Sequence, residues 1–336
     1  MKKYALIFLV FCMIFIFLPV FCIQGIAPIS DPIIYEPIAE TVFNPQIIKE
    51  PKKVKVYMHK TDEVVEMELV EYLCGVLNGE VPSNYEPDAL KAQAVAAFTY
   101  LVYHMEAEIA SPGLVEKHKG AWICTDSTHC KAFISEADAR KSWGDLWYDK
   151  YKDNVKDAVT STLYTVMTYD GKPINAVFHS ISSGMTEDAF DVWGSQIPYL
   201  KAVMSNVDTT AEKYLTVENF TVDNFKSLLN KANIKVELSD NHKNWITDIK
   251  RSASGGVTTL RIGDTEVKGM SLRMALGLRS TNFTITYNEK GLIFTVKGYG
   301  HGVGMSQYGA NALAKEGKTY KEILEYYYSD IAFENY

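Results

Sequence analysis

Positive charge is scarce in this sequence of 336 residues, because its 34 lysines and arginines are outnumbered by 41 aspartates and glutamates. The formal net charge of −7 lacks the basic excess with which a general nucleic-acid binder neutralises phosphates. We therefore expect no nucleic-acid partner, and a polymeric substrate would not be strongly anionic. Internal repeats are also lacking, and 47% apolar residues suffice for the core of one large domain or two smaller ones.

The N-terminal region lacks the small-x-small pattern that follows the apolar run of a cleaved signal peptide. Residues Tyr4 to Ile23 are almost continuously apolar and are preceded by two lysines. This pattern predicts an uncleaved anchor over residues 1–26, with the N-terminus in the cytoplasm and the bulk of the protein outside. A cleaved signal peptide is the alternative. Phe21 stands before Cys22, where lipid attachment favours a small residue, so we expect no lipid anchor.

A proline-rich stretch separates this apolar run from the rest of the chain. It contains Pro28, Pro32, Pro37, Pro45 and Pro51. Repeated proline prevents a regular helix, so residues 27–52 are predicted to be an extended tether that holds the domain off the membrane. The folded domain is then expected over residues 53–336.

Glycine is concentrated around one histidine in the stretch Gly300 to Ala310, which reads GHGVGMSQYGA. Glycine costs conformational entropy, so such a cluster usually has a steric or a binding reason. A glycine-rich loop that opens a helix can present free N–H groups to a polar ligand. A tight strand-to-helix turn is the alternative.

Two further polar clusters lie upstream. The segment Gly79 to Pro82 contains Glu80, the one acid that we predict to be catalytic, and the segment Phe178 to Glu187 combines a histidine with hydroxyl groups and a glycine. Three polar clusters on separate elements suggest a shared cleft.

Periodicity predicts the elements that carry these clusters. We expect strands at Val54–Met58 and Val64–Glu68, a helix at Leu69–Leu77 that leaves Glu80 on a loop, and a buried helix that begins at Pro87. Two hairpins, one over Leu163–His179 and one over Phe283–Val296, would each lead into a polar loop. Gly317 would end a helix that starts near Met305, and Thr319 with Glu322 forms a capping box. The predicted fold class is α+β, with helices and antiparallel strands around a cleft.

A possible metal site is packed into seven residues. Cys124, His129 and Cys130 supply two thiolates and an imidazole, which is a ligand set that zinc favours. A closed structural site needs a fourth ligand, for which Asp126, His118 or water are candidates. A disulfide is one alternative, because an exported domain can oxidise its thiols, and inert thiols are another.

Other chemistry is less well supported by the sequence. His179, Glu187 and His301 match no compact metal-binding spacing. A serine nucleophile at Ser180, Ser182 or Ser183 would need a histidine and an orienting acid, so these serines suit hydrogen bonding to a ligand better. A zinc hydrolase that cuts stem peptides at the cysteine cluster is a further alternative.

The three clusters together resemble the stage II sporulation protein D family of exported peptidoglycan lytic transglycosylases. The resemblance covers roughly residues 54–331. The similar motifs are Glu80-Val81-Pro82 with Ala89 to Ala97, then His179-Ser180 through Glu187, Asp191 to Gly194, Pro198 to Leu200, Leu278 to Thr281 and Gly300 to Ala310. One position departs from the family pattern, since Phe98 stands where the family usually has arginine.

The resemblance implies cleavage between N-acetylmuramic acid and N-acetylglucosamine, with formation of a 1,6-anhydro ring. It implies action from the mother-cell membrane during engulfment of the forespore, beside a cell-wall amidase and endopeptidase partner that strips the stem peptides. Glu80 would be the catalytic acid and base. Candidates for binding the sugar are Gln93, Tyr100, His179, Ser182, Ser183, Thr186, His301, Ser306 and Gln307. Related domains in amidase enhancers leave a non-catalytic glycan-binding activator as the alternative.

Overall fold

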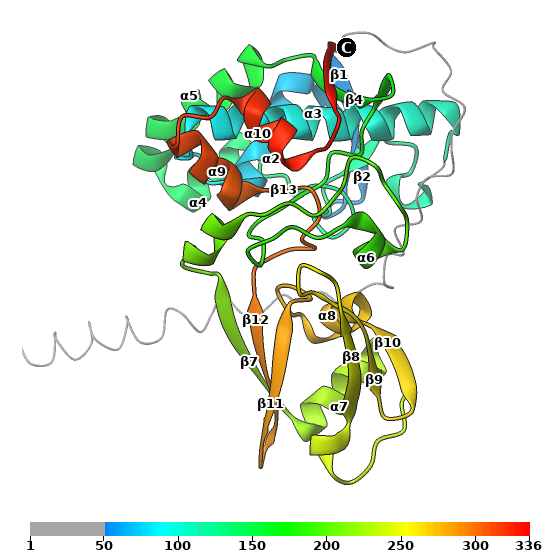
Figure 1. Cartoon of the computed structure of the whole chain (residues 1–336). Helices are drawn as coiled ribbons and strands as arrows, with labels where there is room; N and C mark the ends of the chain where they lie inside the picture. The colour runs from blue at the N-terminus through cyan, green and yellow to red at the C-terminus, as the bar shows by residue number, and fades with distance from the viewer. Residues whose placement is uncertain (1–50, 114) are drawn as a thin grey trace, which may run out of the picture. The chain divides into compact units, whose positions relative to one another are not determined.

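The computed structural model describes residues 51–113 and 115–336, which form helices and mainly antiparallel sheets (Figure 1). The predicted α+β class is therefore confirmed. The predicted anchor and all but the last two residues of the predicted tether lie outside the described residues. Within the described ranges, no helix is both long enough and apolar enough to cross a membrane.

The helices follow one another along the chain as α2 (Leu69–Glu80), α3 (Pro87–Ala110), α4 (Glu136–Trp143), α5 (Asp145–Ser161), α6 (Ala189–Trp193), α7 (Val222–Lys231), α8 (Gly269–Leu276), α9 (Gln307–Lys315) and α10 (Tyr320–Tyr327). Short 3-10 turns are η1 (Glu116–His118), η2 (Asn206–Thr210) and η3 (His242–Asn244).

The strands are β1 (Lys53–Met58), β2 (Glu63–Glu68), β3 (Ile123–Cys124), β4 (Thr165–Tyr169), β5 (Lys172–Pro173), β6 (Phe178–His179), β7 (Leu215–Thr221), β8 (Ile246–Arg251), β9 (Val257–Ile262), β10 (Thr265–Lys268), β11 (Phe283–Asn288), β12 (Gly291–Lys297), β13 (Met305–Ser306) and β14 (Ala332–Asn335). They form small sheets with the orders β2-β1-β3, β14-β4-β5, β13-β6, β11-β12-β7 and β10-β9-β8.

Helix α3 lies at the centre of the first hydrophobic core. Its alanines, valines and leucines leave no polar face in the middle of the helix, so α2, α5, α9, α10 and β4 pack around it. Pro87 occupies the first turn, where its missing N–H has no helical partner to lose. The expectation of a buried helix that begins at this proline is confirmed.

Helix α2 extends three residues beyond the predicted end and finishes at Glu80, which therefore lies on a helix terminus and not on a loop. Val81 is extended, with φ −132° and ψ 149°, because the proline that follows it disfavours a helical conformation. Apolar periodicity ends before this stop signal, which is why the predicted helix was too short.

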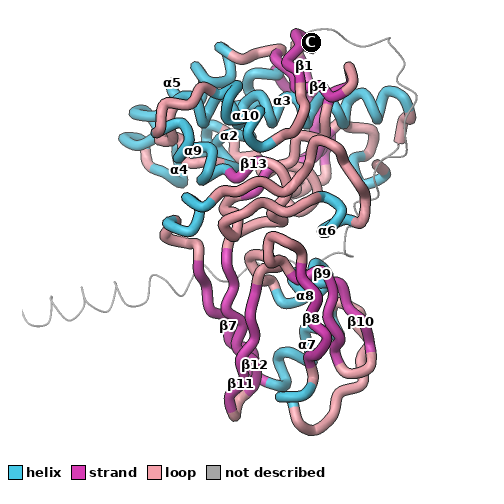
Figure 2. Tube along the Cα trace, in the orientation of Figure 1, coloured by secondary structure: helices cyan, strands magenta, loops and turns pink. Residues whose placement is uncertain are grey.

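The first predicted hairpin is only partly correct. Strands β4 and β5 pair through the turn at Asp170 and Gly171, both with positive φ, but β5 is two residues long. The chain then leaves this sheet, and β6 pairs in parallel with β13. Most of the chain from β5 to η2 is loop (Figure 2). The second hairpin is confirmed, since β11 and β12 pair antiparallel over six residue pairs.

A second hydrophobic core lies within residues 220–296. Strands β7 to β12 and helices α7 and α8 enclose Phe225, Trp245 and Phe294, whose rings lie about parallel to one another. Backbone and side-chain hydrogen bonds tie this part to the loop after β6, for example from the Gly256 N–H to the Glu187 carboxylate at 3.1 Å. All described residues belong to one compact unit.

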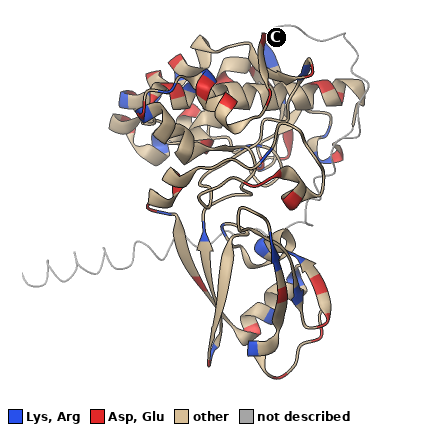
Figure 3. Cartoon of the chain, in the orientation of Figure 1, with Lys and Arg blue, Asp and Glu red and all other residues tan. Residues whose placement is uncertain are grey.

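Local signals at the C-terminal helices agree with the structure. Thr319 and Glu322 form the capping box of α10, and Gly317 has a positive φ just after α9. Charged side chains of both signs are mixed over the described elements (Figure 3).

Candidate active site and metal centre

Glu80 ends α2 with its carboxyl group turned toward the loop before α4. The Ala132 N–H donates to Glu80 Oε1 at 2.7 Å, and the Gln307 amide lies 3.5 Å from Oε2. Gln307 also lies 3.4 Å from Gln93 Oε1. Three elements that are far apart in sequence thus meet at one carboxyl group.

The surroundings of Glu80 favour the protonated carboxyl group, but they also contain groups that stabilise the carboxylate anion. Burial raises the pKa of Glu80, whereas the Lys131 ammonium, the Ala132 N–H and the Gln307 amide act to lower it. Such opposed influences suit a group that must hold a proton at one step and release it at another.

Lys131 is buried between two aromatic rings. Its Nζ lies 3.9 Å from the ring centre of Tyr100 and 3.8 Å from that of Phe178. Burial lowers the pKa of Lys131 to about 8, against the opposing effect of Glu80. Sequence reasoning did not identify this lysine, because no local pattern distinguishes it from a surface residue.

A pocket of about 530 Å³ opens beside Glu80. It is lined by Asn78, Gly79, Glu80, Val81, Pro82, Ser83, Trp143 and Trp147. The Trp147 indole N–H donates to the Ser83 hydroxyl at 3.3 Å, which connects α5 with the chain after α2. One acid among apolar and aromatic walls is typical of a small-molecule or sugar site. Neither tryptophan belongs to a motif that the sequence singles out.

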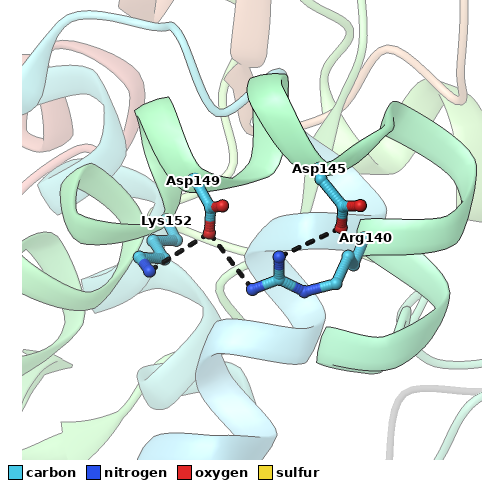
Figure 4. Close-up of polar contacts among 4 residues, drawn as sticks. All are labelled: Arg140, Asp145, Asp149 and Lys152. Atoms are coloured by element: carbon cyan, nitrogen blue, oxygen red, sulfur yellow. Dashed lines mark hydrogen bonds and ion pairs between the residues drawn. The ribbon is translucent and has the colours of Figure 1, made fainter.

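Ion pairs join the two helices that carry these tryptophans. Arg140 of α4 contacts Asp145 at 3.1 Å and Asp149 at 3.2 Å, and Lys152 contacts Asp149 at 3.2 Å (Figure 4). Each pair is exposed and contributes about 0–1 kcal/mol. Together they hold the sharp bend at Gly144, which has φ 81°, and so help to place Trp143 and Trp147 at the pocket.

His179 and His301 lie against each other, with ring centres 5.8 Å apart. His301 bonds the Phe178 carbonyl through Nε2 at 3.0 Å and accepts the Val303 N–H at Nδ1 at 3.1 Å. His179 bonds the Val303 carbonyl through Nδ1 at 3.1 Å, and burial lowers its pKa to about 4. Burial also lowers the pKa of His301, so both imidazoles are neutral and fasten the glycine-rich loop to β6.

The glycine-rich loop has a steric reason for its composition. Gly300 has φ 119°, and a Cβ there would lie 2.6 Å from the His179 Cβ. Gly304 has φ 71°, and a Cβ there would overlap the Val177 carbonyl. Side chains are therefore excluded where the loop passes β6.

The predicted sugar-binding residues fall into two groups. Gln93, Tyr100 and Gln307 surround Glu80 and Lys131. The hydroxyl groups of Ser182, Thr186 and Ser306 are buried and accept backbone N–H groups of Gly184, Val203 and Gly309 respectively. Ser183 donates to the Ser254 carbonyl at 3.2 Å. Sugar binding by His179, His301 and this second group stays a prediction.

Asp208 organises the second group and was not predicted. It is fully buried, and its Oδ2 accepts the Ser182 N–H at 2.9 Å. Phe98, where the family usually has arginine, is buried edge-on against Tyr164 and Tyr336, each with ring centres 6.1 Å away. Its ring fills an aromatic cluster and does not line the Glu80 pocket.

The predicted metal cluster gains a fourth candidate ligand. One ligand atom from each of His118, Cys124, His129 and Cys130 lies within 4.8 Å of all the others. His118, on η1, lies 3.1 Å from His129 and 3.2 Å from the Cys130 sulfur. Asp126 instead accepts the Thr128 N–H and hydroxyl. The fourth position therefore falls to His118.

The spacing of these atoms fits zinc. With Zn–N bonds of about 2.0–2.1 Å and Zn–S bonds of about 2.3 Å, a tetrahedral ion separates its ligand atoms by roughly 3.3–3.8 Å. The imidazole of His129 lies 3.5 Å from the Cys124 sulfur and 3.3 Å from that of Cys130. Both cysteines are free thiols, and hydrogen bonds from Cys130, His118 and His129 lower the pKa of Cys124. Four protein ligands are the pattern of a structural site.

Comparison with known proteins gives the family. A family model described as Stage II sporulation protein matches residues 57–169. Stage II sporulation protein D of Bacillus subtilis (strain 168) is 39% identical over 279 residues, which cover 83% of this chain and 78% of that protein. The protein of the same name from Bacillus amyloliquefaciens is 37% identical over 288 residues, covering 85% and 80%.

A more distant relative carries a different name. The amidase enhancer of Bacillus subtilis (strain 168) is 26% identical over 313 residues, which cover 79% of this chain but only 40% of the enhancer. The segment matched by the family model contains Glu80, Lys131 and the metal cluster. With this match, and with close to 40% identity over most of both chains, the protein belongs to the stage II sporulation protein D family of sporulation proteins.

Proposed function

We propose that this protein is a peptidoglycan lytic transglycosylase that cleaves the bond between N-acetylmuramic acid and N-acetylglucosamine in peptide-stripped strands. The observation that carries the proposal is a single, partly buried carboxyl group at an aromatic pocket of about 530 Å³. Of the eight residues that line this pocket, Glu80 is the only acid. Family membership supports the same reaction class.

The first step is protonation of the leaving oxygen. Because burial raises the pKa of Glu80, the carboxyl group carries a proton over a wider pH range than an exposed glutamate would. It gives this proton to the glycosidic oxygen as the bond to the anomeric carbon of N-acetylmuramic acid breaks. The Lys131 charge and the Ala132 N–H then stabilise the carboxylate that remains.

The second step returns the proton to Glu80. The carboxylate takes it from the C6 hydroxyl of the same sugar, whose oxygen bonds to the anomeric carbon and closes the 1,6-anhydro ring. Water is not consumed. Because the nucleophile belongs to the substrate, the second carboxylate of ordinary glycosidases is not needed, which agrees with the single acid in the pocket.

We propose that His118, Cys124, His129 and Cys130 hold a structural zinc ion. When bound, the ion would cross-link the loop that continues directly into Lys131 and Ala132. Those two residues place a charge and an N–H beside Glu80, so the ion would support the catalytic group through the loop and would not itself contact the substrate.

The experiment is a digest of peptide-stripped glycan strands, with the products identified by mass spectrometry. We expect fragments one water lighter than hydrolysis products from the wild type. Glu80→Gln should lower the rate about 10²–10⁴-fold, which is the usual contribution of general acid and base catalysis. Glu71→Gln, on the exposed side of the same helix, is the matched control and should cleave normally. Equal rates for wild type and Glu80→Gln would refute the assignment.

The alternative is a glycan-binding activator of a cell-wall amidase, which similarity to the amidase enhancer favours. In that case a purified amidase should be stimulated equally by the wild type and by Glu80→Gln, with no anhydro products.

For cellular context, we propose action from the mother-cell membrane, through the N-terminal segment, during engulfment of the forespore. An amidase and endopeptidase partner would remove the stem peptides first.

A further inference from the structure

A second pocket, of about 150 Å³, lies where α6 meets β9 and the start of α8. Its lining includes Glu187, Phe190 and Trp193 on one side and Thr259 and Lys268 on the other. None of these residues lines the pocket of Glu80.

Two buried polar atoms at this pocket have no hydrogen-bond partner among the described residues, namely Glu187 Oε2 and Thr259 Oγ1. Glu187 is only 5% exposed, and its carboxyl group is contacted by the Gly256 N–H at Oε1 and by the Ser252 hydroxyl, which leaves Oε2 as the oxygen without a partner. Buried polar groups normally find a partner, so an unsatisfied pair at one cavity indicates a ligand that supplies hydrogen bonds.

The apolar part of the pocket is aromatic. Phe190 is 53% exposed at the mouth of this pocket, and Trp193 packs on the His301 ring with centres 5.5 Å apart. Exposed aromatic surface beside unsatisfied polar atoms suits a ligand with both an apolar face and hydroxyl or amide groups. Acidic Glu187 and Asp191 are balanced in part by Lys268, so the lining does not demand a strongly charged ligand.

We infer that this pocket is a second sugar subsite, which binds one N-acetylated sugar unit of a glycan strand away from the cleavage point. The inference rests on the proposed function for the class of ligand, but not on catalysis. Residues 301–307 connect the two sites, because His301 contacts Trp193 and Gln307 contacts the carboxyl group of Glu80. Glu187 and Thr259 would hydrogen-bond the N-acetyl or hydroxyl groups, while Phe190 covers a face of the sugar ring.

The test measures binding of hexa-N-acetylchitohexaose by calorimetry to the full-length protein carrying Glu80→Gln, so that cleavage cannot interfere. Adding Phe190→Ala or Thr259→Val should weaken binding about fivefold or more, as expected for one lost contact. Val217→Ala and Thr247→Val, at exposed positions on β7 and β8, are matched controls and should bind normally. Unchanged affinity for both pocket variants would overturn the inference.

A kinetic arm separates this inference from the proposed function. With Glu80 intact, Phe190→Ala should raise KM for glycan strands and leave kcat unchanged. If the wild type binds the hexasaccharide but never cleaves strands, the proposed function fails and the subsite stands. If the wild type cleaves and the variants match it in both KM and affinity, only the subsite fails. Binding of a muramyl peptide at this pocket in preference to the bare sugar chain would also overturn it.

Discussion

At the scale of single residues, Glu80, the catalytic candidate, lies where its ionised form lowers the stability of the fold. A buried carboxyl group with a raised pKa is disfavoured as an anion, and Glu80 has only a partial set of compensating contacts. Natural proteins often keep such conflicts at functional sites. Because the conflict lies in protonation, it can be measured through pH.

We predict that Glu80→Gln stabilises the protein above neutral pH. The folded-state pKa lies above the ordinary value, so the stabilising contribution of the glutamate is fully present below about pH 4.3 and is lost as pH rises through the raised value. Thermal unfolding at pH 8 should show a higher Tm for the variant, by about 2–4 °C for each kcal/mol. The difference should vanish near pH 4, and Glu71→Gln should show no such trend. A Tm gain that is independent of pH would contradict the prediction.

Lys131 should set the alkaline limit of activity. Its charge lowers the pKa of Glu80, so Lys131→Met should raise that pKa and move the alkaline limb of the kcat profile to higher pH. The rate at the optimum should also fall, because the carboxylate formed in the first step loses its cation. Lys290→Met, at an exposed turn, is the control. An alkaline limb that stays in place would show that Lys131 does not act on the acid.

The resemblance to the family singled out Glu80 as the catalytic candidate, which stays a prediction, but it did not indicate the partners of Glu80. Its position before a proline and a long helix is a local pattern. Lys131 comes near Glu80, and the two tryptophans line its pocket, only because α2 packs against α3, α4 and α5. Nothing within five residues of Trp147 indicates that its ring lies beside Ser83, 64 positions earlier.

At the scale of elements, short sequence patterns predicted helix ends and tight turns, but they did not predict which distant strands pair. The capping box at Thr319, the proline at the start of α3 and the hairpin of β11 and β12 follow from short patterns. The parallel partner of β6 lies more than a hundred residues away on β13, so no turn signal reveals it. The mainly apolar stretch Ile174 to Phe178 after the turn therefore suggested a longer hairpin than the chain forms.

Helix α5 should contribute binding more than chemistry. Trp147→Ala removes an aromatic wall of the Glu80 pocket, so we expect KM for glycan strands to rise about tenfold with kcat little changed. Leu146→Ala changes the neighbouring side chain, which is 91% exposed and does not line the pocket, and serves as the control. A fall in kcat at unchanged KM would mean that the ring positions Glu80 instead.

Metal binding by the loop that contains Cys124, His129 and Cys130 should affect both the stability and the activity of the protein. Removal of zinc by a chelator, or Cys124→Ser, should lower Tm by several degrees and reduce cleavage, because the loop that carries Lys131 and Ala132 loses its cross-link. Metal analysis should find one zinc per chain in the wild type. Cys74→Ser, at a half-buried thiol outside the cluster, is the control. A chelated protein with normal Tm and no bound metal would contradict this.

At the scale of the whole molecule, the sequence indicated one domain after the tether but not its internal division. Two separate hydrophobic cores lie within the described residues, and the second is built from β7 to β12 with α7 and α8. Within this part the sequence offered one short motif, Leu278 to Thr281, which did not indicate a separate core. We expected the three polar clusters to lie together. The first cluster and Gln307 do meet at Glu80, whereas Ser182 and Thr186 make hydrogen bonds where the two cores meet.

If the domain is exported as proposed, the candidate metal cluster has a consequence for its maturation. Cys124 and Cys130 face the same point in space and are six positions apart in the chain. A disulfide between the two sulfurs would remove both thiolates from the ligand set. Metal binding and oxidation would therefore compete for the same two cysteines in each newly made molecule. The fraction of protein with an intact metal site would then depend on the concentration of zinc available when the chain folds.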